Sequence, residues 1–382
     1  MKQRLLTPGP SMVPEDTLLE LARPVPYHRT AEFRQVLAEV TEDLQYVFRT
    51  KNPVLTLTSS GTGAMEAAVV NCLPAGSKAI CLISGRFGER FRSLCKAFGV
   101  EAVTVTVAPG ESVQPEQLVK ALAEHPDAKA VFSTLSETST GVTHDLATFG
   151  KIIAPTPAVF VVDAISGLGV MECQTDLWHI DVCVTGSQKA LMLPPGLALV
   201  SVSDKAWKRI EANAGAPAFY FDLKKYKATL QNSDTPFTPA HTLVRALRMS
   251  LKRIRAEGIE NSWKRHALLA AAARAGMQAL GLELFAKQPA HGLTVAKAPP
   301  GIDSTTILTM LEKQYGMKLA NGQDALKGKI FRLAHMGYID QFDVIGALGA
   351  VELVLLELGH PVQPGSAVAE AQRTFAAAVP RK

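Results

Sequence analysis

Cysteine is scarce in this chain and follows none of the spacings that bind metals. The 382 residues contain five cysteines, an odd number, with no CxxC pair and no Cys/His ligand spacing. This pattern excludes a disulfide framework and a structural zinc site, and the sequence predicts no bound metal. Unpaired cysteines favour reduced thiols and therefore a cytoplasmic protein.

Long apolar runs are also absent. No window reaches the roughly 18 uninterrupted apolar residues of a membrane-spanning helix, and MKQRLLTPGPSMVP has only two consecutive leucines before Pro8. We therefore expect neither a secretory signal nor a membrane span. The most apolar window, GALGAVELVLLELG from Gly346, carries Glu352 and Glu357, which indicates a buried or half-buried helix.

Charge of one sign does not gather anywhere along the chain. Lys and Arg number 40 against 35 Asp and Glu, for a net charge of +5, and the two signs are interleaved. A dedicated nucleic-acid surface is therefore not expected, because it needs a basic patch or stripe. A hydrophobic content of 47% is typical of a compact globular protein, and its length indicates two or three domains at about 150 residues each.

Apolar, β-branched runs alternate with helical segments through the first half. Parallel strands joined by helices are buried on both faces, so this alternation predicts a three-layer α/β/α domain with a mainly parallel sheet. The runs begin at Val54, Lys78, Ala102, Ala130, Ala158, Val182 and Leu197.

The pattern changes after Ser203, where helices and loops replace strands. Two helices separated near Gly258 are followed by a smaller α+β domain. We divide the chain into an N-terminal arm (1–20), a large domain (21–250) and a small C-terminal domain (251–382). The tail beyond Gly365 is expected to be a helix end followed by frayed residues near Pro380.

Three strand ends carry chemistry, because ligands of open parallel sheets bind outside the carboxyl ends of the strands. The first is Ser59-Ser60-Gly61-Thr62-Gly63, whose small residues open a helix and suit a phosphate. It lacks GxxxxGK[ST] and GxGxxG, which excludes the common ATP and dinucleotide loops. An ordinary N-cap and tight turn is the alternative.

Asp163 and Lys189 end two later strands. Asp163 follows the apolar run AVFVV, so it is either a buried acid that needs a cationic partner or a helix cap. Lys189 precedes ALMLPPG, an apolar setting that lowers the pKa of an amine, although an ordinary surface lysine is the alternative. A phosphate loop, an acid and an amine on one sheet are what pyridoxal phosphate needs.

The sequence resembles fold-type I, class V pyridoxal-phosphate aminotransferases, above all the alanine–glyoxylate, serine–pyruvate and serine–glyoxylate group. The resemblance covers nearly the whole chain. It rests on LLTPGP, YVFRTKNPVLTLTSSGT, SETSTGV, VVDAISGLG, GSQKALMLPPG, FTPAHT, GIENSW and FRLAHMGYI, in that order.

The resemblance implies a role for each residue at the cofactor. Lys189 forms the Schiff base with pyridoxal 5'-phosphate and shuttles the proton, and Asp163 keeps the ring nitrogen protonated. Four residues bind the phosphate: Ser60, Gly61, Thr62 and Gln188.

The resemblance also implies which residues surround the ring and the substrate. Phe87 stacks on the ring where close relatives have a tryptophan, and Ile165 lines its other face. Thr138 replaces a serine that contacts the ring oxygen or the substrate. Arg332 pairs with the substrate carboxylate. Gly9 belongs either to an arm over the site or to a plain turn.

A homodimer with shared active sites follows from the same resemblance. Thr242, or Thr238, reaches the phosphate of the neighbouring subunit. The animal enzymes place a tyrosine shortly before this threonine, whereas no tyrosine follows Tyr226 in this stretch, so the choice of threonine stays open.

The implied function is ping-pong transamination from alanine or serine to a 2-oxo acid, with glyoxylate as the acceptor. Another class V aminotransferase is an alternative, because aspartate fits if Arg86 or Arg90 meets its side chain. A cysteine-desulfurase-like lyase is disfavoured because no cysteine follows Cys183. A non-catalytic subunit of the same fold, as in relatives labelled hydrogenase subunits, is disfavoured by the presence of Lys189, Asp163 and Arg332.

Overall fold

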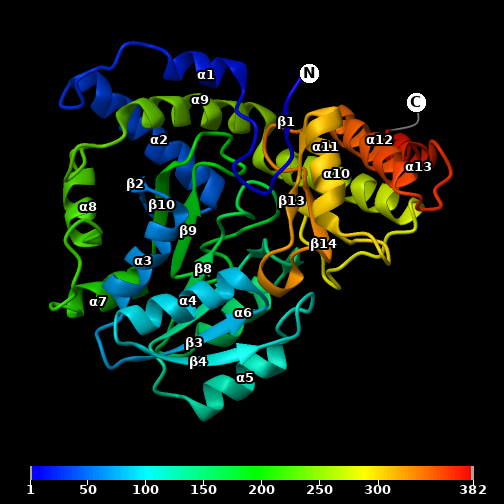
Figure 1. Ribbon diagram of the computed structural model, residues 1–382. Coiled ribbons are helices and arrows are strands. Elements are labelled where there is room, and N and C mark those ends of the chain that lie inside the picture. Colours follow the sequence, from blue (N-terminus) through cyan, green and yellow to red (C-terminus); the bar gives the residue numbers. More distant parts are fainter. Residues whose placement is uncertain (1, 380–382) are drawn as a thin grey trace.

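A seven-stranded sheet forms the centre of the computed structural model, which describes residues 2–379 (Figure 1). In their order across the sheet, the strands are β2 (Val54–Ser59), β10 (Gly196–Val202), β9 (Val182–Gly186), β8 (Val159–Asp163), β5 (Ala130–Thr134), β3 (Lys78–Ile83) and β4 (Glu101–Thr106). Only β10 among them runs antiparallel to its neighbours. The predicted mainly parallel sheet is confirmed.

Helices cover both faces of this sheet. The buried apolar residues form one hydrophobic cluster on each face of the sheet. Along β8, Phe160 and Val162 belong to the cluster on one face, and Val159 and Val161 to the cluster on the other. The first face is covered by α2 (Ala31–Phe48), α5 (Pro115–Glu124), α6 (Leu146–Ile153) and α9 (His241–Glu257). The second is covered by α3 (Gly61–Cys72), α4 (Arg86–Ala97), α7 (Asp204–Ala212) and α8 (Leu223–Leu230). The three-layer architecture is therefore confirmed.

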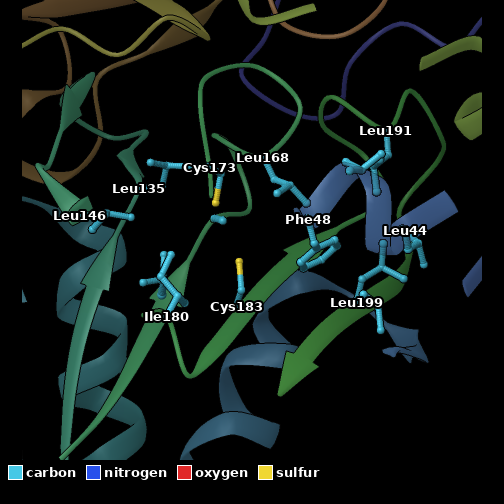
Figure 2. Packing of buried hydrophobic residues seen from close by; sticks show 14 of the residues in the cluster. Leu44, Phe48, Leu135, Leu146, Leu168, Cys173, Ile180, Cys183, Leu191 and Leu199 are labelled. Carbon is cyan, nitrogen blue, oxygen red and sulfur yellow. The ribbon is translucent and has the colours of Figure 1, made fainter. Parts of the chain in front are cut away.

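Buried cysteines contribute to the first of these clusters. Figure 2 shows Cys173 and Cys183 among apolar side chains that include Phe48 of α2 and Leu199 of β10. All five cysteines are buried and free, as expected from their number and spacing.

The C-terminal part contains a three-stranded sheet, β11 (Leu293–Lys297), β14 (Ile330–Ala334) and β13 (Ala320–Asn321). Its helices are α10 (Ile259–Ala279), α11 (Ser304–Tyr315), α12 (Gln341–Glu357), α13 (Ser366–Ala377) and the short η1 (Asp324–Leu326). The expected separation of two helices near Gly258 is present, because this residue adopts φ 85° between α9 and α10. The domain boundary at 250 stays a prediction and lies inside α9.

The expectation for the C-terminal tail is wrong. Instead of a helix end, residues beyond Gly365 form α13, which packs against α10 and α12 (Figure 1). Ala367, Ala371 and Phe375 are buried at a spacing of four, which aligns them on one face of the helix. Glu352 accepts hydrogen bonds from the amides at the start of α13. Pro380 lies outside the described residues.

The N-terminal segment joins the two parts. Its strand β1 (Arg4–Leu5) pairs with β12 (Met317–Lys318), and α1 (Glu15–Leu21) packs on α9. A small hairpin, β6 (Ser136–Glu137) with β7 (Val142–Thr143), follows β5. None of the helices described could cross a membrane, and no group of three or more His, Cys, Asp or Glu within 2–379 could hold a metal.

Candidate active site

Asp163 is the last residue of β8, and Lys189 follows β9, the neighbouring parallel strand. Both side chains are buried. Burial raises the pKa of Asp163 to about 7, and the charges of Lys189 and Arg90 oppose this shift. Burial lowers the pKa of Lys189 to about 8, and Asp163 opposes that shift in turn. The expected buried acid and the expected low-pKa amine therefore lie within electrostatic reach of each other.

Hydrogen bonds fix the backbone on either side of this pair. Asp163 Oδ1 accepts a hydrogen bond of 2.8 Å from the Ile165 amide. Ser11 Oγ donates to the Lys189 carbonyl at 2.6 Å, and the Ser11 amide donates to the Gln188 carbonyl at 3.0 Å. The N-terminal segment is thus tied to the lysine loop.

Gly9 belongs to this tied segment and lies against the lysine side chain. Lys189 Nζ donates a hydrogen bond to the Pro8 carbonyl. Gly9 has φ 109°, and a Cβ at this position would overlap the end of the Lys189 side chain. Only glycine fits so close an approach at a positive φ. Of the two open alternatives, the structure has the arm over Lys189.

The proposed phosphate loop starts α3, beside the end of β9. Ser60 is the N-cap residue and is exposed, and Gly61 and Thr62 open the helix. A Cβ at Gly186 would lie 3.2 Å from the Gly61 amide nitrogen and 3.0 Å from Gln188 Oε1. Three of the four predicted phosphate residues therefore form the N-terminus of α3, and Oε1 of the fourth, Gln188, lies on the same side of Gly186 as the Gly61 amide.

These residues fit pyridoxal phosphate. A helix N-terminus with uncovered amides suits the phosphate, a buried amine suits the aldehyde, and an acid on the adjacent strand suits the ring nitrogen. Ser60, Gly61, Thr62 and Gln188 together form the candidate phosphate cup. Within it, Gln188 Oε1 is buried without a hydrogen-bond partner among the described residues, which marks the cup as a polar site. Ile165 packs against the cup, since its Cδ1 would be 2.5 Å from a Cβ at Gly61.

Phe87 is positioned by Glu137, a residue that the sequence reasoning missed. Glu137 Oε2 accepts hydrogen bonds of 3.0 Å from the amides of Phe87 and Gly88, and Oε1 accepts from the Ser139 amide at 3.1 Å and from its hydroxyl at 2.5 Å. Burial raises the pKa of this carboxyl. The acid of the ETSTG motif therefore caps α4, and its only signal in the sequence was the motif itself.

Arg332 extends from β14 toward Thr138. Its Nε and Nη2 donate to the Asn321 carbonyl at 3.0 and 2.7 Å, and Nη1 donates to the Thr138 carbonyl at 3.0 Å. One N–H on each terminal nitrogen has no partner among the hydrogen bonds of the described residues and can donate to a carboxylate. Thr138 Oγ1 also lies 2.5 Å from Ser166 Oγ, so these side chains form one polar network.

Thr238 and Thr242 lie on a different segment. Thr238 is exposed, and the half-buried Thr242 is in the first turn of α9. This segment is held to β2 by the Ala240 amide, which donates to Thr58 Oγ1 at 2.8 Å. The assignment of either threonine to a neighbouring subunit's phosphate stays a prediction.

Residues 21–338 match the family described as Aminotransferase class-V. The chain belongs to this family. As a class-V aminotransferase it is an enzyme, and the recognition made from its motifs is confirmed.

Several relatives of this class-V aminotransferase carry more specific names. An L-aspartate–glyoxylate aminotransferase of Paracoccus denitrificans is 33% identical, with 97% of this chain and 96% of that protein covered. A serine–glyoxylate aminotransferase of Methylorubrum extorquens is 32% identical, with 97% and 95% covered. A protein of Synechococcus named soluble hydrogenase, small subunit, is 41% identical, with 99% of both covered.

Solved structures of the same family share the whole fold. The ureidoglycine–glyoxylate aminotransferase of Bacillus subtilis superposes with a TM-score of 0.93 at 28% identity, and 98% of each chain is covered. The three-layer domain and the smaller C-terminal part therefore both belong to the family fold.

Proposed function

We propose that this aminotransferase binds pyridoxal 5'-phosphate and moves the amino group of alanine or serine to a 2-oxo acid, with glyoxylate as the favoured acceptor. The observation that carries the proposal is the placement of Asp163 at the end of β8 and of Lys189 just after the adjacent strand β9, where their charges influence each other. Their pKa values, about 8 and about 7, lie close to neutrality. Groups that titrate in this range are suited to moving protons.

The chain's own residues hold the reactants and move one proton in each half-reaction. When bound, pyridoxal phosphate supplies an aldehyde that condenses with amines and a ring that withdraws electrons. Lys189 Nζ takes the proton from the substrate α-carbon, because its lowered pKa leaves part of the amine uncharged near neutral pH. Asp163 would hold the protonated ring nitrogen, and Phe87 and Ile165 would line the ring.

Arg332 orients the substrate through its carboxylate. The guanidinium is already fixed by the carbonyls of Asn321 and Thr138, so little conformational entropy is lost when a carboxylate binds. The backbone of Gly9 lies over Lys189 and keeps water from the amine. Orientation and exclusion of water both favour proton transfer over side reactions.

The overall reaction is an exchange between two acids. A first amino acid loses its amino group and leaves as a 2-oxo acid, while the enzyme keeps the amino group. A second 2-oxo acid then takes it and leaves as an amino acid. Both half-reactions use the same residues, so the kinetics follow a ping-pong scheme.

A single buried arginine suits substrates with one carboxylate. Aspartate is the second candidate donor, because the Paracoccus relative carries that name and Arg86 is half-exposed at the start of α4. In this structure Arg86 Nη1 lies 3.5 Å from Asp324 Oδ1. An acidic donor has to displace this ion pair, which favours the smaller donors.

The two other functional alternatives, a cysteine desulfurase and a non-catalytic subunit, have less support. A desulfurase needs a reactive cysteine, and the five thiols here are all buried. The name of the Synechococcus relative matches the non-catalytic alternative, but the polar network around Lys189 and Arg332 has no use in a purely structural subunit.

The same proposal includes a cytoplasmic homodimer with shared sites. Exposed apolar side chains, which a second copy would cover, lie on the N-terminal segment and in the loop before α8. They are Leu18, Leu19, Val25, Tyr27, Phe219 and Tyr220.

The donor is identified by single-turnover reactions of the protein loaded with pyridoxal phosphate. The visible absorbance of the bound cofactor is followed after addition of alanine, serine, aspartate, glutamate or phosphoserine. We expect alanine or serine to discharge it fastest. Arg332→Ala is expected to raise the amino-acid concentration needed by about 100-fold, because it removes a charge-assisted, bidentate pair.

The same titrations contain the control for this proposal. Cofactor affinity of Arg332→Ala should remain within about twofold of the wild type, since the hydrogen bonds of Arg332 within the described residues go to Asn321 and Thr138 and to none of the phosphate residues. Equal losses in amino-acid and cofactor binding would contradict the role of Arg332, and absence of discharge by every donor would contradict transamination.

A further inference from the structure

The phosphate cup assigned from the sequence contains no positively charged side chain. Ser60, Gly61, Thr62 and Gln188 are all neutral, whereas a phosphate ester carries a charge of about −1.5 to −2 at neutral pH. The helix N-terminus offers only a partial positive charge of about +0.5. The cup therefore lacks a full countercharge for its ligand.

Arg90 brings a guanidinium to this cup from α4. Its Nη1 donates to Thr62 Oγ1 at 3.0 Å, in the first turn of α3. Its Cζ also lies 4.8 Å from the centre of the Phe87 ring. These two contacts hold the guanidinium between the proposed stacking ring and the proposed phosphate loop.

The charge of Arg90 is not neutralised by the protein. Among residues 2–379, the ion pairs of α4 belong to Arg86 and Arg92, and no carboxylate lies within 4.0 Å of the Arg90 guanidinium. A half-buried cation without an anion is costly unless a ligand supplies one. The same charge lowers the pKa of Lys189, so it acts inside the site.

The hydrogen bond to Thr62 also fixes how that hydroxyl is used. A guanidinium can only donate, so Thr62 Oγ1 accepts in this contact. The single hydroxyl proton of Thr62 then remains available to a phosphate oxygen. Arg90 therefore leaves the Thr62 hydroxyl free to donate its hydrogen bond to the phosphate, and it also supplies positive charge.

We propose that Arg90 is a further cofactor-anchoring residue, which recognises the phosphate group of pyridoxal phosphate together with Thr62. This inference rests on the proposed cofactor. The competing role, contact with an acidic substrate side chain, fits Arg86 better, because the charge of Arg86 acts on Arg332 whereas Arg90 is bonded to the phosphate loop.

The test compares two ligands that differ only in the phosphate. Apoprotein is titrated with pyridoxal phosphate and with pyridoxal, and binding is followed by absorbance. In Arg90→Gln we expect the dissociation constant for pyridoxal phosphate to rise about 10- to 100-fold, the loss of a charged hydrogen bond, while that for pyridoxal stays within about twofold. Arg90→Lys should recover part of the loss, because it restores the charge without the fork geometry.

Arg92→Gln is the matched control, since Arg92 lies on the same helix but is exposed and paired with Glu89. It should leave both dissociation constants unchanged. In the wild type, inorganic phosphate should compete with pyridoxal phosphate, and this competition should weaken in Arg90→Gln.

Three results would overturn the inference. Equal weakening of both ligands in Arg90→Gln would mean that Arg90 acts through Phe87, and unchanged binding of both would mean that it has no role. A wild-type protein that binds pyridoxal phosphate without transaminating would instead refute the proposed reaction while leaving the role of Arg90 intact. Failure of the wild type to bind it at all would refute both.

Discussion

Burial acts in opposite senses on the two charged residues beside the cofactor site. It penalises the carboxylate of Asp163 and the ammonium of Lys189, which moves their pKa values toward each other. In the apoprotein, both groups therefore change charge over a narrow interval around neutral pH. A bound pyridinium would favour the ionised form of Asp163.

This shift predicts a pH-dependent effect of Asp163→Asn on the apoprotein. The carboxyl has a pKa of about 7 in the folded state against an ordinary value of 3.8. Between these values the folded state keeps a proton that the unfolded state has lost, so stability falls as pH rises through this window. The variant lacks this loss, and its melting temperature should exceed that of the wild type by more at about pH 8 than at about pH 5.

Thermal denaturation of the two apoproteins at both pH values measures this difference. Removal of the Asp163 charge also lowers the pKa of Lys189 further, because that charge opposes the effect of burial. A lower folded-state pKa makes stability rise with pH from a lower pH onward, so this effect widens the difference in the same direction. If the difference in melting temperature between Asp163→Asn and the wild type is constant with pH, or becomes smaller as pH rises, the result would contradict a buried, protonated Asp163.

Secondary-structure elements show which parts of the site a sequence can reveal. Asp163 and Lys189 were identifiable because each ends a strongly apolar run, and parallel strands end at one edge of a sheet. Glu137 was not, because its partners are the amides of Phe87 and Gly88 at the start of a helix about fifty positions earlier in the chain. Backbone partners leave no trace in the sequence.

Packing between helices explains two further features of the structure that the sequence analysis did not predict. The contact of Arg90 with Thr62 depends on how α4 lies against α3 and could not be read from either helix alone. For α13, the spacing of Ala367, Ala371 and Phe375 was visible, but small alanines gave it little apolar contrast. Its contact with α10 supplies the stabilisation that the local sequence lacks.

At the scale of the whole molecule, distant segments of one chain form the site. The N-terminal arm, the strand ends of the central sheet and β14 of the C-terminal sheet all contribute residues. The fold class and the order of these segments could be predicted from the sequence. Whether Gly9 belongs to an arm over Lys189 or to a plain turn depends on tertiary packing and could not be decided from the sequence.

The proposed dimer predicts complementation between two defective variants. Lys189→Ala lacks the amine, and Thr242→Val lacks the hydroxyl proposed to serve the neighbouring subunit. If sites are shared, a mixed dimer contains one intact site, so mixing and reassembly should restore part of the activity. Sedimentation should show a particle of twice the 40.9 kDa chain mass.

The same mixing experiment with Thr238→Val decides between the two threonines. Restoration with only one of them identifies the residue that crosses the interface. A monomer in sedimentation with full activity would contradict shared sites altogether.

The covalent position of the cofactor tests the central claim most directly. The protein is loaded with pyridoxal phosphate, reduced with borohydride, digested and analysed by mass spectrometry. We expect one reduced cofactor on the peptide that contains Lys189, and none in Lys189→Ala. Attachment to another lysine, or no attachment in a folded wild-type protein, would contradict the account.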